Sequence, residues 1–267
     1  MLRRPAVADQ FYPGDPSSLR YMIDGYLKGH PEPQKALAAV SPHAGYVYSG
    51  KVAGQVLGGV HIPRRVVVLG PNHRGVGAHA AVMSEGHWLT PLGQVDLDAD
   101  LAALLRQKCG VVEEDSLAHQ FEHSLEVQVP FLQVLRPDFL LTPLCLGHLG
   151  YNGCQEVGQG LSQAIEAAGE PVLMVASTDM THYESAEAAK EKDTKAIERI
   201  LALDPQGLYD TVRGLGITMC GVLPTTVAMI AAKELGASEV ELVAYTNSGE
   251  TSGDYQQVVG YAGLIIK

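Results

Sequence analysis

Two histidines follow hydrophobic segments of the sequence through turns that contain proline. His43 lies in the segment SPH and His73 in GPNH, each after a run that is typical of a buried strand. Neutral imidazole is the commonest metal ligand in proteins, and a rigid turn can hold one at the rim of a pocket. A single histidine in such a place more often caps a turn or a helix. Two in equivalent positions favour a metal site.

A cysteine is the third candidate ligand. Cys220 lies in the segment GITMCGVLPTT, just before a predicted helix. A thiol at a helix N-terminus has a lowered pKa, which makes it a better metal ligand or nucleophile. The alternative is a small buried side chain, which is the usual role of a free cysteine. The other three cysteines have no polar context and are interpreted in this second way.

Candidates for proton transfer lie in two further segments. Asp179 and His182 are three residues apart in STDMTHYE, where a carboxylate can orient an imidazole for acid/base chemistry. The alternative is that Asp179 caps a helix and His182 lies on the surface. His123 and Glu126 are also three apart, in FEHSLEV. That cluster either binds metal or places carboxylates, with Glu122, in the first turn of a helix.

Alternating strands and helices must position these side chains. Short apolar runs predict buried strands at 36–40, 65–70, 139–147, 171–177, 240–245 and 258–267. Amphipathic stretches predict helices at 49–60, 98–108, 123–135, 153–168, 185–202 and 222–235. Ser49-Gly50 and Asp204-Pro205 are typical helix starts. The alternation predicts an α/β fold, with a central mostly parallel or mixed sheet flanked by helices.

Polar motifs follow four of these predicted strands. They are SPHAGYVYSG, PNHRG, STDMTHYES and TNSGETSGD, and three of the four contain histidine. Ligands in such sheets bind beyond the carboxyl ends of the strands. An ordinary structural domain places Gly, Asn and Asp there for turns but has no need of histidine. We therefore expect the functional site at this edge.

Composition limits the classes of protein that this chain can belong to. It has 267 residues, of which 46% are hydrophobic and 18% charged, and this predicts one globular domain spanning residues 1–267. A net charge of −11 argues against binding of a nucleic-acid backbone. The sequence contains no run of 18 apolar residues, so no membrane span is predicted. The N-terminus is not typical of a signal peptide. The four unpaired cysteines are typical of a cytoplasmic protein.

Taken together, the motifs resemble the Memo family along nearly the whole chain, and among its members the B component of the AmmeMemoRadiSam system. The matching segments are AVADQFYPGD, SPHAGYVYSG, VVVLGPNHRG, EHSLEVQVPFL, ASTDMTHYES, TMCGVLPTT and GYAGL. Their number, order and spacing make the resemblance specific. It implies a fold similar to the catalytic subunits of class III extradiol dioxygenases, which hold non-haem Fe(II).

The resemblance also implies roles for individual residues. The two histidines and one cysteine that hold iron or copper in the family match His43, His73 and Cys220. The neighbouring Asp and His match Asp179 and His182, and a further pocket histidine matches His123. The sequence departs from animal members at two places. Gln128 replaces a histidine, and Val222-Leu223 replaces Arg-His.

Two functions follow as hypotheses. The first is a non-haem oxidoreductase acting on a small molecule, with Fe(II) as the first choice of metal and Cu or Zn as alternatives. Cysteine in place of a carboxylate softens the site and widens that choice. The second is a metal carrier or a peptide-binding module that uses the same cleft. Tyr46, Tyr48 and Tyr183 either stack on an aromatic ligand or pack in the core. The resemblance implies the radical SAM and Amme components of the system as partners.

Overall fold

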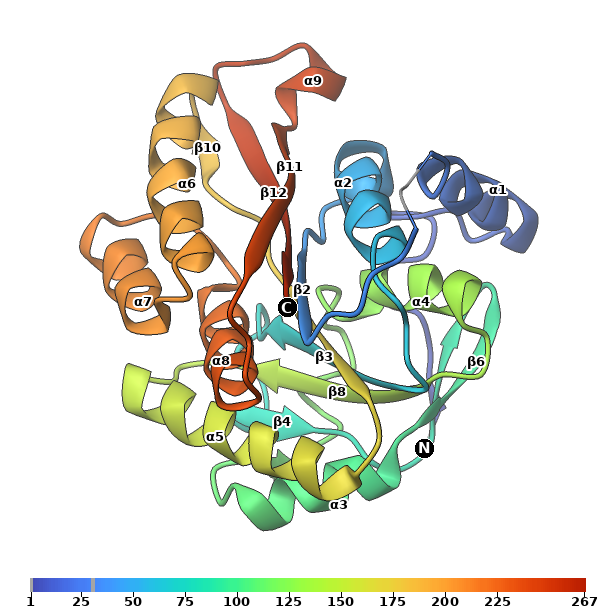
Figure 1. Ribbon diagram of the computed structural model, residues 1–267. Helices are drawn as coiled ribbons and strands as arrows, with labels where there is room; N and C mark the ends of the chain where they lie inside the picture. The colour runs from blue at the N-terminus through green and yellow to red at the C-terminus, as the bar shows by residue number, and fades with distance from the viewer. Residues whose placement is uncertain (1, 30–31) are drawn as a thin grey trace.

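Helices cover both faces of one mixed β-sheet in the computed structural model, which describes residues 2–29 and 32–267 (Figure 1). The strands are β1 (Leu2–Arg3), β2 (Ala38–Ser41), β3 (Arg65–Pro71), β4 (Ala80–Val82), β5 (His87–Thr90), β6 (Gly93–Leu97), β7 (Glu113–Glu114), β8 (Leu140–Leu146), β9 (Val172–Ser177), β10 (His182–Glu184), β11 (Val240–Asn247) and β12 (Val258–Ile266). The helices are α1 (Pro16–Tyr26), α2 (Tyr46–Gly58), α3 (Ala99–Lys108), α4 (Val129–Leu135), α5 (Tyr151–Ala168), α6 (Ala186–Leu201), α7 (Pro205–Gly214), α8 (Val222–Glu234) and α9 (Gly249–Ser252), with a 3₁₀ turn at Glu126–Gln128.

The centre of the sheet is parallel. Its strands follow the order β8-β3-β9-β2, and all three pairs in that run are parallel. β12 pairs with β2 in the antiparallel direction, and β10 and β11 pair with β12 in the same way. β6, β5 and β1 extend the other side, where β4 also pairs antiparallel with β8. The predicted α/β fold with a mostly parallel or mixed sheet is confirmed.

Burial on both faces explains the apolar runs of the central strands. Residues 66–71 of β3 are all buried, because helices lie over both sides of the sheet. α8 contacts β2, β3 and β9 and also packs against α5, so residues 222–232 of α8 are buried. α2 contacts β2 and β12, and α1 and α4 pack beside α2 (Figure 1). These two layers of helices hold the sheet in place, and with it the edge at which the polar motifs lie.

One predicted helix start is wrong. α2 begins at Tyr46 after Gly45, whereas the sequence predicts a start at Ser49-Gly50. The Ser49 hydroxyl donates back to the Ala44 carbonyl at 2.9 Å instead of capping a helix. Gly50 lies inside α2, where an added Cβ would be 2.5 Å from a ring carbon of Tyr26. The glycine therefore marks close packing between α1 and α2, not a helix end. At α7 the prediction is confirmed, because the side chain of the capping aspartate accepts from a backbone amide.

The predicted helix at 123–135 is shorter than expected. A 3₁₀ turn at Glu126–Gln128 leads into α4, which begins at Val129 with Pro130 in its first turn. Proline is favoured at that position because the first amides of a helix have no partner within it. His123 and Glu122 consequently lie in a loop. Their side chains are therefore placed by tertiary contacts and not by helical spacing.

Sequence patterns also leave several short elements unpredicted. β1, β4, β5, β6, β7 and β10 have two to five residues each and lie outside the parallel centre. Runs so short carry too few side chains to show a period. Within residues 2–29 and 32–267, no helix combines the length and the apolar character needed to cross a membrane.

Candidate metal centre

Three parallel strands end side by side and place their following loops together. Ser41 of β2 pairs with Ser177 of β9, and β3 pairs with β9 on the other side. His43 follows β2 by two residues, His73 follows β3 by two, and Asp179 follows β9 by two. Because the strands are parallel, the three loops meet at the carboxyl edge of the sheet.

Three imidazoles form a cluster at this edge. His43, His73 and His123 each offer a ring nitrogen, and these atoms lie within 4.8 Å of one another. The ring centroid of His43 is 5.3 Å from that of His73 and 5.4 Å from that of His123. The rings of His73 and His123 stack, with their centroids 4.6 Å apart. His43 is buried, His123 half-buried and His73 exposed. The cluster is therefore closed on one side and open to solvent on the other.

A buried carboxylate orients the His73 ring and lies beside the His123 ring. Glu122 Oε1 accepts from Nδ1 of His73 at 2.9 Å and lies 3.4 Å from Nδ1 of His123. Burial alone would raise the pKa of Glu122, but the hydrogen bond and charge of His73 and the amide of Ser124 lower it to about 2. With its Nδ1 atom held by this carboxylate, the His73 ring keeps Nε2 available as a ligand, and the same oxygen lies within ion-pair distance of Nδ1 of His123.

His43 is the deepest member of the cluster. Burial lowers the pKa of its ring well below the ordinary value of 6.5, and the neighbouring imidazoles lower it further. Burial likewise lowers the pKa of His123 to about 4. Both rings are therefore neutral at pH 7, which is the form that binds metal ions.

Cys220 lies beside the cluster without being part of it. Its sulfur is 3.2 Å from Nε2 of His43, yet within the described residues the set of donors that are mutually within 4.8 Å contains the three histidines only. Burial raises the pKa of the Cys220 thiol, and the charge of Asp179 raises it further. The expectation that the helix end lowers this pKa is thus wrong for the cysteine without a bound cation, because desolvation outweighs the helix end.

Asp179 lies beside both His43 and Cys220, and its backbone amide donates to the Cys220 sulfur at 3.3 Å. Its Oδ1 accepts from the backbone amide of His43 at 2.8 Å, and its Oδ2 is 4.0 Å from the Nε2 atom of that ring. Burial raises the pKa of Asp179 to about 7, against the opposing hydrogen bonds from the amides of His43 and Ala44. A carboxyl group with this pKa holds and releases a proton near neutral pH.

His182 lies in β10, and not on the helical face that its spacing from Asp179 allows. Its backbone amide donates to Thr218 Oγ1 at 2.7 Å, and its ring Nδ1 donates to the Thr218 carbonyl at 3.0 Å. Since a carbonyl only accepts, Nε2 of His182 carries the lone pair. Burial lowers the pKa of this ring. Tyr183 beside it is 74% exposed and has a φ of 60°. It is therefore not a core residue.

The structure brings the ligand candidates and Asp179 together and shows partners that sequence patterns do not reveal. His123 occupies a place in the cluster that the sequence assigns to Cys220. Glu122, for which the sequence leaves open a metal site or a charge at a helix start, orients the His73 ring. Ser177 lies 3.0 Å from Nδ1 of His43. Its signal in the sequence is only its position as the last residue of a strand.

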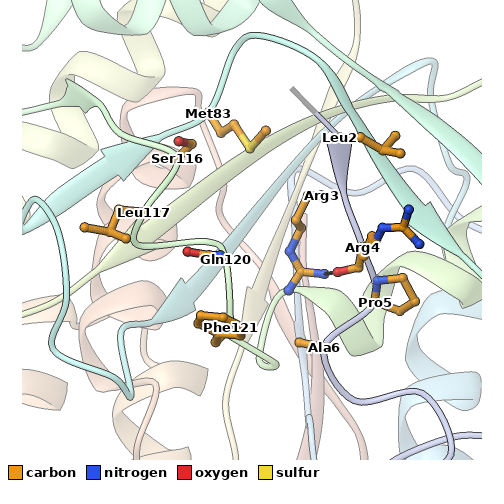
Figure 2. Close-up of a pocket in the computed structure, with 10 residues that line it drawn as sticks. All are labelled: Leu2, Arg3, Arg4, Pro5, Ala6, Met83, Ser116, Leu117, Gln120 and Phe121. Atoms are coloured by element: carbon orange, nitrogen blue, oxygen red, sulfur yellow. Dashed lines mark hydrogen bonds between the residues drawn. The ribbon is translucent and has the colours of Figure 1, made fainter.

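A separate cavity of about 440 Å³ lies behind the loop that carries Glu122 and His123 (Figure 2). Leu2, Met83, Leu117 and Phe121 supply apolar walls, and none of the clustered histidines lines it. Arg3 forms part of the wall, donates to the Glu122 carbonyl at 2.7 Å and pairs with the buried Glu126 carboxylate. This cavity therefore borders the back of the loop and not the candidate centre.

The fold and the cluster define an α/β protein with a candidate metal centre at the carboxyl edge of its sheet. The family of Memo-like proteins matches residues 3–265, and the chain belongs to that family. A MEMO1 family protein of Methanopyrus kandleri is 45% identical, over 100% of this chain and 99% of its own length. One of Aquifex aeolicus is 42% identical, over 99% and 98%. The crystal structure of an uncharacterized protein from Escherichia coli K12 has a similar fold, with a TM-score of 0.58 and 15% identity over 86% of this chain and 100% of that chain.

Proposed function

We propose that this protein binds a first-row transition metal ion through Nε2 of His43, His73 and His123, and that it is a non-haem oxidoreductase for a small molecule. The observation that carries the proposal is the convergence of three imidazoles whose Nδ1 atoms have protein partners. Rings held in this way present a fixed set of nitrogen donors, as metal-binding histidines do.

The donor set supports iron, copper or zinc. Imidazole suits all three metals, whereas carboxylates and water suit magnesium, calcium and manganese. Fe(II) is the first choice because of the resemblance to extradiol dioxygenases. Cys220 offers a second set, His43, His73 and Cys220, since its sulfur is 3.2 Å from Nε2 of His43. A thiolate ligand would favour soft Cu(I).

The surrounding residues supply proton transfer and access. When bound, a redox-active metal ion would supply electron transfer and a site for small molecules at its open positions. Asp179, with a pKa of about 7, gives or takes a proton beside the cluster. His182 offers the lone pair of Nε2, because its Nδ1 proton is used by Thr218. The exposed His73 gives access from solvent. The partners implied by the resemblance, the radical SAM and Amme components, remain part of the proposal.

Oxygen uptake tests this function. The protein is loaded with Fe(II) under anaerobic conditions, and oxygen consumption is followed with a panel of catechols and other small phenols. We expect uptake that is lost in His43→Ala and His73→Ala and kept in His61→Ala, which changes an exposed histidine outside the cluster. Tight and specific metal binding without uptake on any of the substrates would instead favour a metal carrier. Absence of metal binding would remove both functions.

A further inference from the structure

The Ser177 hydroxyl has three neighbours in the buried wall behind His43. Its Oγ donates to the Ser124 carbonyl at 2.6 Å. It also lies 2.9 Å from Nε2 of Gln128 and 3.0 Å from Nδ1 of His43. A hydroxyl has one proton and two acceptor sites. Because a carbonyl only accepts, the one proton of Ser177 is used by Ser124.

Gln128 completes this arrangement. Its side-chain nitrogen donates to the Pro42 carbonyl at 2.9 Å as well as to Ser177. Turning the amide over would place its oxygen against that carbonyl, which is also an acceptor, so the orientation is fixed by the contacts. The amide oxygen has no partner among the described residues. Gln128 can therefore only donate to Ser177, and it occupies one of the two acceptor sites of the hydroxyl.

We infer that Ser177 is a positioning residue that keeps the ring proton of His43 on Nδ1, so that the lone pair of Nε2 points at the centre. The remaining acceptor site of Ser177 must take a proton from His43, because the Ser124 carbonyl accepts the hydroxyl proton and Gln128 donates to the other acceptor site. Nε2 is the atom 3.2 Å from the Cys220 sulfur, on the cluster side of the ring. The inference rests on the proposed metal function, because only a ligand needs this tautomer.

Glu122 performs this task for His73, and Ser177 performs it for the buried His43. A neutral hydroxyl does so without placing a second charge in the wall, where burial makes charges costly. Ser41 provides a matched comparison. It pairs with Ser177 across β2 and β9 and is equally buried, but its hydroxyl has no partner among the described residues. Removing it deletes the same atoms without touching His43.

The tautomer is measured directly by long-range ¹H–¹⁵N NMR on metal-free protein labelled at histidine, at about pH 8, above the ordinary imidazole pKa. We expect His43 with a protonated Nδ1 and a bare Nε2 in the wild type and in Ser41→Ala. In Ser177→Ala, the tautomer of His43 with an unprotonated Nε2 should no longer be the only one observed. A His43 ring protonated on Nε2 in the wild type would overturn the inference, whatever the protein binds.

Zinc affinity gives the second readout. A competition titration with a chromophoric chelator should show a loss of about 10–100-fold in Ser177→Ala and none in Ser41→Ala. Ser177→Thr retains a hydroxyl and should recover affinity, which separates the hydroxyl from a packing effect. Equal affinity of Ser177→Ala and the wild type would overturn the role of Ser177. A wild type that binds no zinc or iron would instead remove the proposed function and leave the tautomer result standing.

Discussion

Glu122 holds both the backbone and the ring of His73, accepting from the backbone amide at 2.7 Å through Oε2 and from Nδ1 at 2.9 Å through Oε1. The carboxylate is fully buried, whereas 31% of the His73 side chain is exposed. An exposed ligand is thus anchored to a buried charge. This double contact holds His73 in place at the open side of the cluster.

The first prediction concerns this anchor. Glu122→Gln removes the charge and one of the two acceptor oxygens, so the side chain no longer accepts from both the backbone amide and Nδ1 of His73, and His123 loses the neighbouring charge. Zinc affinity should fall by about 10–100-fold, as for other partners of metal-binding histidines. A chelator competition titration measures it. Glu187→Gln, on an exposed position of α6, is the control and should bind as the wild type does. Unchanged affinity of Glu122→Gln would show that the carboxylate does not orient the ligands.

The second prediction concerns the thiols. Among the four cysteines, Cys220 is partly exposed and the other three are buried. Iodoacetamide should therefore modify Cys220 before the three buried thiols, although desolvation around its sulfur raises the pKa of this thiol and makes the reaction slow below alkaline pH. Bound zinc or copper should protect it. Mass-spectrometric mapping at successive times follows the four sites. Earlier modification of Cys109, Cys145 or Cys154 would contradict the exposure that the structure assigns to Cys220.

The third prediction concerns Gly221, which follows Cys220. A Cβ at this position would lie 2.3 Å from Cβ of Thr178 and 2.4 Å from the Ser177 carbonyl oxygen. Gly221→Ala must therefore push the cysteine loop away from the end of β9. Overpacking of this kind lowers the free energy of unfolding by about 1–3 kcal/mol.

Chemical denaturation measures the change. Gly25→Ala in α1 is the matched control, since nothing lies within 4 Å of the added Cβ, and its stability should be unchanged or slightly higher. If Gly221→Ala is as stable as Gly25→Ala, the close approach of the cysteine loop to β9 is wrong.

The fourth prediction concerns acid stability. His119 is fully buried, donates from Nε2 to the Ala81 carbonyl at 3.1 Å, and has its pKa lowered to about 4 by burial and by the charge of Arg3. Between pH 6.5 and 4 the unfolded chain binds this proton and the folded chain does not. The free energy of unfolding therefore falls as the pH falls through that window.

His119→Gln keeps a donor near the Nε2 position but does not titrate. Between pH 7 and pH 5 its loss of unfolding free energy should be smaller than that of the wild type by about 2 kcal/mol. Urea denaturation at the two pH values gives the difference. An identical loss in both proteins would show that His119 is protonated in the folded state.

Part of the site can be predicted from the sequence because the topology of the sheet can be predicted. His43, His73 and Asp179 each follow a predicted buried strand, and parallel strands bring their carboxyl ends to one edge. This prediction does not require knowing which distant loops contact one another. Apolar runs that alternate with helices likewise predict the parallel centre of the sheet, because parallel strands are buried on both faces.

The remaining features depend on tertiary contacts. His123 and Glu122 lie in a loop whose course is set by hydrogen bonds from Arg3 at the start of the chain, and no local pattern encodes that pairing. The pKa of Cys220 depends on burial, which the sequence position before α8 does not show. Ser177 gains its role only through its neighbours in space.

The most direct test of the metal centre is an anomalous difference map from crystals grown with zinc or, under anaerobic conditions, with Fe(II). We expect one strong peak at about 2.0–2.3 Å from Nε2 of both His43 and His73. The third ligand in the same map decides between His123 and Cys220. A peak elsewhere on the protein, or coordination through Nδ1 of His43 or His73, would contradict the proposed centre.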